Sequence, residues 1–254
     1  MIYVKKRLLL LVSCVKLSRN ATAFNLKGDE FELYKTKRAF IGNIVLFVLE
    51  VFATAWIMSG ISAAGGPLDG PNYESLKYYT VDSNILMGIA ALVAAVAQWR
   101  VMKGKAREVP RWTLVLTLAG TVSVTLTMLI TIFFLGPTIG RVYGFFSLFA
   151  NSSLFLHLIN PVTAIFVFLR YERSDRIPFR LTPLAILPTV LYAVYYVALT
   201  LQHITNGAVE AGYDWYGFFA FGIDIWWLVV AVILLITYGI TLLLWRLNRS
   251  RAQS

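Results

Sequence analysis

The chain has 254 residues, of which 58% are hydrophobic and only 14% are charged. Soluble domains have about 25% charged residues, so this composition excludes an ordinary soluble protein and indicates an all-α, polytopic integral membrane protein. The formal net charge is +10, but the basic residues lie between apolar runs rather than along one face, which argues against nucleic acid as a partner. A single cysteine excludes an intrachain disulfide, and with only two histidines we expect neither a metal site nor a cofactor.

The first 38 residues are basic and precede the first long apolar run. Lys5-Lys6-Arg7, the short apolar run Leu8–Val12 and then Ser13-Cys14 resemble a bacterial lipoprotein signal. That apolar core is short for a signal peptide, which needs about 7–15 residues. We therefore expect residues 1–38 to be a basic amphipathic segment on the cytoplasmic membrane surface, with lipid attachment at Cys14 as the alternative.

Six apolar segments follow, each long enough to cross a hydrocarbon core. Glycine–proline pairs or runs of charge separate most of them. The predicted spans lie near 39–60, 78–100, 112–136, 146–170, 183–201 and 218–246, and together they form a domain over 39–246. A basic tail, 247–254, ends the chain.

Lysine and arginine are distributed unequally between the two sets of loops. Of the 23 such residues, only Lys77 and Arg141 fall in the loops after spans 1, 3 and 5. The positive-inside rule therefore predicts a six-helix bundle with both termini in the cytoplasm, and we expect a multi-pass protein of the plasma membrane.

Polar residues inside apolar spans are costly in a membrane and usually face a protein interior or a wet cavity. Span 1 has Glu50 near its middle, and span 4 has Ser153, His157, Asn160 and Pro161 on one face. Because Pro161 has no N–H, it frees the carbonyl of His157 and loosens the helix there. We predict one outer layer of polar groups contributed by three helices, which comprises Thr80, Asp82, Ser83, Asn84, Asn151, Asp224 and His157. Ser153, Asn160 and Glu50 are further candidates for the same pocket.

Span 3 carries threonine at every fourth position: Thr113, Thr117, Thr121 and Thr125. Small hydroxyl residues with this spacing are typical of helix-packing surfaces in membranes, so we expect a packing role for them rather than a polar pathway.

Two motifs stand out: Lys77-Tyr-Tyr-Thr80-Val-Asp-Ser83-Asn84 at the start of span 2, and Leu156-His157-Leu-Ile-Asn-Pro161 in span 4. This pairing resembles the Pr6Pr and androgen-induced FAR-17a-type family of multi-span membrane proteins. The resemblance covers roughly residues 39–246. It implies a hydrolase that cleaves fatty acid esters of hydroxy fatty acids with a threonine nucleophile and a histidine, and these roles fall on Thr80 and His157.

The implied chemistry places a requirement on the fold. A threonine hydroxyl becomes nucleophilic when an adjacent base takes its proton, and we expect Asn84, Asn151 or Asn160 to donate to the oxyanion. With span 4 starting near 146, His157 lies about 15 Å along that helix at 1.5 Å per residue. Thr80 and His157 therefore meet only if span 2 begins earlier or span 4 later.

Two functional hypotheses remain open. The first is an intramembrane lipid-ester hydrolase, with membrane lipids around it and a lipid ester as its substrate. The alternative is a small transporter or a lipid- or solute-binding protein in which Glu50, Asp82, His157 and Asp224 bind a solute or relay protons. The spans do not contain the paired, Gly/Pro-broken segments in matching halves that are typical of inverted-repeat transporters, which favours the enzyme.

Overall fold

The structure is a computed structural model that describes residues 33–61, 72–138, 140–172, 176–219, 222 and 224–252. Most of the predicted segment 1–38, including the lipoprotein-like stretch at Cys14, lies outside these residues. Its last residues, from Leu33 on, form the start of a long helix rather than a separate segment.

In the described residues, six helices are long and apolar enough to cross a membrane, as the prediction of a helical membrane bundle requires. They span Leu33–Ser59, Tyr79–Met102, Arg111–Thr138, Ser152–Tyr171, Phe179–Gln202 and Trp226–Ser250.

Several of these spans consist of more than one kind of helix. The second is a single α-helix, α2 (Tyr79–Met102), preceded by the 3-10 turn η1 (Asn72–Lys77). The third comprises α3 (Arg111–Ile130), a π-helical turn η2 (Thr131–Leu135) and α4 (Gly136–Thr138). The fourth comprises α6 (Ser152–Leu154), a second π-helical turn η4 (Phe155–Ile159) and α7 (Asn160–Tyr171). The fifth comprises the 3-10 segment η6 (Phe179–Ile186) and α8 (Leu187–Gln202), and the sixth is α9 (Trp226–Ala252).

Two of the predicted span limits need correction. The fourth span begins at Ser152 rather than near 146, because α5 (Gly140–Tyr143) and the 3-10 turn η3 (Phe145–Phe149) occupy the preceding residues. Gly144 (φ 87°) and Asn151 (φ 54°) adopt left-handed conformations at the two ends of η3 and interrupt the helix. The sixth span begins at Trp226 rather than near 218.

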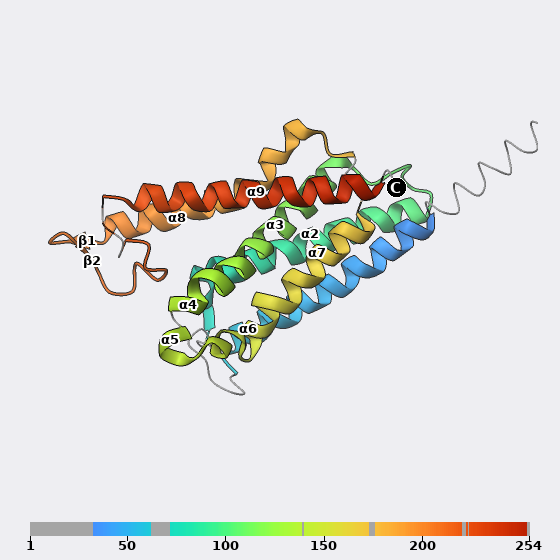
Figure 1. Cartoon of the computed structure of the whole chain (residues 1–254). Coiled ribbons are helices and arrows are strands. Elements are labelled where there is room, and N and C mark those ends of the chain that lie inside the picture. The colour runs from blue at the N-terminus through green and yellow to red at the C-terminus, as the bar shows by residue number, and fades with distance from the viewer. Residues whose placement is uncertain are drawn as a thin grey trace, which may run out of the picture.

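The core lies where the first helix, α2, α3 and α7 pack together. Leu46 of the first helix, Met87 of α2 and Ala164 of α7 belong to one buried cluster. A β-carbon at Gly120 would lie 3.1 Å from the α-carbon of Met87, so glycine allows α2 and α3 to approach closely. In Figure 1, α8 and α9 run along α3 and diverge from α4 toward the end that carries β1 and β2.

The regularly spaced threonines of α3 are buried, as a packing role requires. Thr117, Thr121 and Thr125 each donate to the carbonyl four residues earlier. Their hydroxyls therefore find partners within their own helix.

The all-α prediction is incomplete, because a small antiparallel hairpin follows α8. Strand β1 (Ile204–Thr205) pairs with β2 (Ala208–Val209). Asn206 (φ 52°) and Gly207 (φ 78°) form the turn, a left-handed pair typical of two-residue hairpins.

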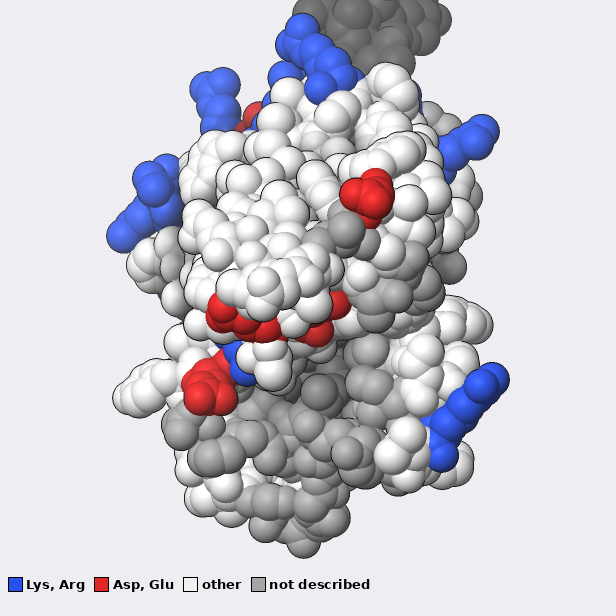
Figure 2. All heavy atoms as spheres, turned by 90° about the vertical axis from the view of Figure 1, so that its left-hand side faces the viewer, with Lys and Arg blue, Asp and Glu red and all other residues white. Residues whose placement is uncertain are grey.

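The two ends of the bundle differ in charge. We term the end at which the first helix begins and α2, α7 and α9 end the basic end; it carries Lys35, Arg107 and Arg176 among others. The opposite, loop end carries η1, η3 and the hairpin. Figure 2 views the loop end: the surface is mostly uncharged, with acidic groups across its middle and Lys and Arg toward its edges.

Candidate active site

Thr80 is the second residue of α2, at the loop end of the bundle. The extended residue Tyr78 precedes the helix, and the N–H of Tyr79 donates to the Tyr216 hydroxyl over 2.8 Å. Burial raises the pKa of the Tyr216 phenol well above its usual value, so this group stays a neutral hydroxyl. Within the described chain, the side-chain hydroxyl of half-buried Thr80 has no hydrogen-bond partner.

His157 lies in the middle of the π-helical turn η4 and is 1% exposed. Its Nδ1 is 2.7 Å from the carbonyl oxygen of Leu148 in η3. A carbonyl only accepts hydrogen bonds, so Nδ1 carries the proton, and Nε2 of the neutral ring is left with a lone pair. Nε2 is buried and has no partner among the described residues. That is the arrangement a general base requires.

Thr80 and His157 line the same cavity, whose volume is about 30 Å³. Its other polar walls include Ser153, Tyr78 and Tyr216. The fourth span begins later than expected, so His157 lies five residues rather than about ten from the start of its helix. This later start is one of the two conditions that the sequence set for Thr80 and His157 to approach each other.

Two further cavities adjoin this one. A cavity of about 70 Å³ shares Thr80, Leu135 and Tyr216 with it and is otherwise lined mainly by apolar and aromatic side chains of α3, α8 and α9. That cavity in turn shares Ile130, Phe218 and Ile233 with a groove of about 540 Å³. The groove is almost wholly apolar and lies between the end of α3 and α9, with Phe133, Leu228 and Val232 in its walls. The three spaces form a series from His157 to the outer side of α9.

Glu50, Asn84 and Asn160 form a separate network deeper in the bundle. Asn160 Nδ2 donates to Glu50 Oε2 over 2.6 Å and to Asn84 Oδ1 over 3.0 Å. Asn84 Nδ2 donates to the backbone oxygens of Thr80 and Leu156, over 2.7 and 3.3 Å. The amide hydrogens of both asparagines are thus used within the network, so neither is directed at the cavity as an oxyanion donor. The network instead fixes the first turn of α2 relative to α7.

The remaining candidates lie at several places around the cavity. Ser83 is buried and hydrogen-bonded to the Thr80 carbonyl and to the Thr127 hydroxyl. Asp82 is half-buried on α2, and Asn151 immediately precedes α6. Asp224 does not join the predicted outer layer: it is exposed and precedes the first residue of α9, since the sixth span begins later than expected.

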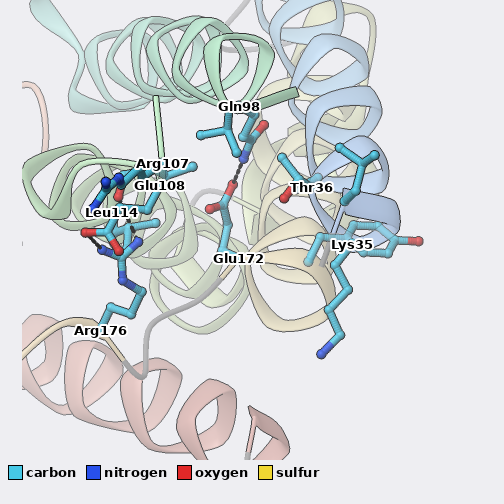
Figure 3. Close-up of a pocket in the computed structure, with 13 residues that line it drawn as sticks. Lys35, Thr36, Gln98, Arg107, Glu108, Leu114, Glu172 and Arg176 are labelled. Carbon is cyan, nitrogen blue, oxygen red and sulfur yellow. Dashed lines mark hydrogen bonds and ion pairs between the residues drawn. The ribbon is translucent and has the colours of Figure 1, made fainter. Parts of the chain in front are cut away.

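A second polar site, at the basic end, was not predicted from the sequence. Glu172, immediately after α7, is 8% exposed, and its Oε1 accepts from Asn43 Nδ2 (2.6 Å) and Gln98 Nε2 (3.0 Å). Burial raises the pKa of this carboxyl above its usual value, and the two amide hydrogen bonds partly oppose that rise. It lines a cavity of about 270 Å³ (Figure 3). Asn43 and Gln98 lie in two different helices, and Glu172 directly follows a third. A single polar residue in or beside a span gives no signal of such a cluster.

Comparison of the chain with protein-family models, with curated proteins and with solved structures finds no match. No group of three or more His, Cys, Asp or Glu residues suitable for a metal ion is found in the part of the chain that the structure describes.

Proposed function

We propose that the protein is a membrane-embedded ester hydrolase in which Thr80 is the nucleophile and His157 the general base. The observation that carries the proposal is that Thr80 and His157 line the same cavity. Neither the Thr80 hydroxyl nor His157 Nε2 has a hydrogen-bond partner among the described residues. The resemblance of the two motifs to the FAR-17a-type family supports the same assignment.

The chemistry follows from the protonation of the ring. His157 Nε2 takes the proton of the Thr80 hydroxyl as Oγ attacks the ester carbonyl carbon, and the carbonyl oxygen becomes an oxyanion. When the tetrahedral intermediate collapses, the proton on Nε2 passes to the leaving alcohol and an acyl ester remains on Thr80. A water molecule, deprotonated by the same nitrogen, then attacks the acyl carbon and releases the carboxylic acid and Thr80. The Leu148 carbonyl holds the ring and stabilises the imidazolium formed in each half of the reaction.

The oxyanion needs a donor, and the side chains in the cavity offer one. Ser153 is buried, and its side chain lines the cavity with Thr80 and His157. We assign the oxyanion contact to this hydroxyl in place of the asparagine amides expected from the sequence.

The adjoining cavities indicate the kind of ester. The series widens from about 30 Å³ at His157 to about 540 Å³ in the groove beside α9, and its polar groups lie mainly at the narrow end. This arrangement suits a lipid ester whose acyl chain lies in the groove and whose carbonyl reaches Thr80. The groove also offers a route for a lipid to enter from the bilayer between α3 and α9.

The orientation in the membrane is part of the proposal. Lys and Arg concentrate at the basic end, so that end faces the cytoplasm and the active site opens toward the outer leaflet of the plasma membrane. A transport function receives less support, because Asp224 lies exposed outside α9 and Glu50 belongs to a different network from His157.

Hydrolysis of fluorogenic and branched fatty acid esters by the purified protein in detergent tests the proposal. We expect Thr80→Ala to abolish turnover and His157→Gln to lower it by about 100-fold or more, as for loss of a general base. Matched controls are Thr138→Ala, an exposed threonine of α4, and His203→Gln, the other histidine, which stacks on Tyr213. Unchanged turnover in a folded Thr80→Ala protein would rule out the assignment.

A further inference from the structure

The buried carboxyl of Glu172 has no part in the proposed hydrolysis, because it lies at the basic end, whereas Thr80 lies at the loop end. Three helices hold it in place: Asn43 of the first helix and Gln98 of α2 bind its Oε1, and Asn248 of α9 donates to its backbone oxygen over 3.0 Å. Asn43 also donates to Gln98 Oε1 over 3.2 Å. The carboxyl is therefore fixed in position.

Its second oxygen, Oε2, has no hydrogen-bond partner among the described residues. In Figure 3 the carboxyl lies between two sides of the cavity, with Arg107, Glu108 and Leu114 on one side and Lys35 and Thr36 on the other. The residue is 8% exposed, and Oε2 is not among its enclosed atoms, so this oxygen can be reached from the cavity. It is therefore available to a ligand that carries an N–H or O–H group.

The outer part of the cavity has the opposite charge. Lys35, Arg107 and Arg176 contribute three cations to its lining. Arg176 forms an ion pair with Glu108 and donates to the Val109 carbonyl over 2.9 Å, which partly compensates its charge and fixes its guanidinium. Arg107 is exposed, and no ion pair is found for it in the described chain. Its guanidinium therefore offers a contact to an anionic group, and guanidinium groups bind phosphate well.

The position of the cavity indicates where the ligand comes from. The lining includes the first residues of the first helix and the last residues of the second and fourth spans, so the cavity lies at the level where spans leave the hydrocarbon. Apolar residues, Leu33, Val101 and Leu114, line it beside the charged groups. A volume of about 270 Å³ holds a head group rather than a whole lipid. Each of these features fits a lipid better than a soluble solute.

We infer that this cavity binds the head group of an aminophospholipid, with the phosphate on Arg107 and its cationic neighbours and the primary ammonium on Glu172 Oε2. A bound lipid of this kind joins the first helix, the α2–α3 loop and the end of α7. Because a quaternary choline has no N–H to donate, the site discriminates ethanolamine from choline. The inference does not depend on ester hydrolysis.

Native mass spectrometry of the full-length protein tests this inference. The protein is equilibrated in mild detergent with equal amounts of phosphatidylethanolamine, phosphatidylcholine and phosphatidylglycerol of identical acyl chains. We expect one phosphatidylethanolamine to be retained in preference to the other two. Glu172→Gln keeps one oxygen that can accept from Asn43 and Gln98, but it removes the negative charge and puts an NH2 group in place of Oε2. It should lower the retention of phosphatidylethanolamine by about 10-fold, the effect of losing one charged hydrogen bond.

Two further variants separate the contributions. Arg107→Ala should weaken retention of all three phospholipids, whereas Lys103→Ala, an exposed cation at the same end outside the cavity, should leave retention unchanged. If Glu172→Gln fails to fold, the inference is tested by the order in which the unaltered protein and the Arg107→Ala protein retain the three lipids. Equal retention of the three lipids, or undiminished retention by folded Glu172→Gln, would overturn the inference. Binding of free phosphoethanolamine without retention of the lipid would identify a soluble ligand and contradict it as well.

Discussion

At the scale of single residues, His157 shows how a buried polar group acquires a defined role. One ring nitrogen is bound to the Leu148 carbonyl, which fixes both the orientation and the tautomer, and the other has no partner among the described residues. The residue lines a cavity that Thr80 also lines. The histidine is thus both a structural residue, through Nδ1, and a candidate base, through Nε2. The two interpretations that its sequence position allowed are compatible with each other.

Glu172 yields a prediction about pH. Its pKa in the folded protein is above the ordinary value of 4.5, so the folded state holds this proton more tightly than the unfolded state does. Stability therefore falls as pH rises from about 4.5 through the raised value, by about 1.4 kcal/mol for each unit of the shift. Glu172→Gln removes this loss of stability. In lipid-free detergent the variant should therefore become increasingly more stable than the unaltered protein as the pH rises from about 4.5 through the raised pKa.

Thermal unfolding midpoints from pH 4 to 8 measure this effect. The other charged residues that line this cavity in the described chain are Lys35, Arg107, Arg176 and Glu108, and all four are kept in both proteins. Glu108→Gln is the control, because Glu108 is 67% exposed at its side chain. A stability difference that does not change with pH would contradict the prediction.

The sequence pointed to Thr80 and His157 through two short motifs and their position in apolar spans. It gave no comparable signal for Glu172, which follows the last residue of a span and lies within the charged run that begins at Arg170. Its donors, Asn43 and Gln98, are single polar residues in different helices. Only the packing of the helices reveals that the three side chains meet.

At the scale of secondary-structure elements, two π-helical turns border the candidate active site. Each ends two residues before a proline: η2 precedes Pro137, and η4 precedes Pro161. A proline lacks the N–H that would bond to the carbonyl four residues earlier, and the wider π turn accommodates that loss. Leu135 of η2 and His157 of η4 both line the cavity, so the irregular turns position its walls.

Pro161→Ala tests the contribution of η4. Restoring the missing N–H favours a regular α-helix, which would rotate His157 away from Thr80. We expect ester hydrolysis to fall by about 10-fold or more without loss of thermal stability, since alanine is favoured over proline by about 3 kcal/mol inside a helix. Pro188→Ala, at the first turn of α8 and outside the cavity, is the control. Full activity of the Pro161→Ala protein would show that η4 is not needed.

The ends of the spans were the least predictable part of the fold. Residues 145–149 are as apolar as a span, yet they form a separate 3-10 turn because Gly144 and Asn151 leave the right-handed helical region on either side. Hydrophobicity does not report backbone conformation, so the sequence placed the start of the fourth span too early. That error placed His157 deeper in the bundle than it is and hid the cavity that it shares with Thr80.

At the scale of the whole molecule, composition alone was sufficient to predict a bundle of long apolar helices. Long apolar segments separated by charge or by Gly–Pro pairs leave few alternatives to membrane-spanning helices, and the described part of the chain contains six helices of the required length and composition. The small hairpin at Asn206-Gly207 was not predicted. The same chain segregates its cations to one end, and this asymmetry underlies the proposed orientation.

Labelling of introduced cysteines tests that orientation. In a Cys14→Ser background, Ala208→Cys places a thiol in the hairpin at the loop end, and Lys105→Cys places one in the loop after α2. We expect a membrane-impermeant maleimide to label the Ala208→Cys protein in intact cells and the Lys105→Cys protein only after permeabilisation. The reverse pattern would place the candidate active site on the cytoplasmic side.

The most direct test of the central claim is to locate a covalent adduct on the nucleophile. The detergent-purified protein is treated with a long-chain alkyl fluorophosphonate, and the modified peptide is identified by mass spectrometry. We expect one adduct, on Thr80, absent from Thr80→Ala and strongly reduced in His157→Gln, while Thr138→Ala is labelled normally. An adduct on another residue, or equal labelling of the His157→Gln protein, would show that Thr80 and His157 do not act as nucleophile and base.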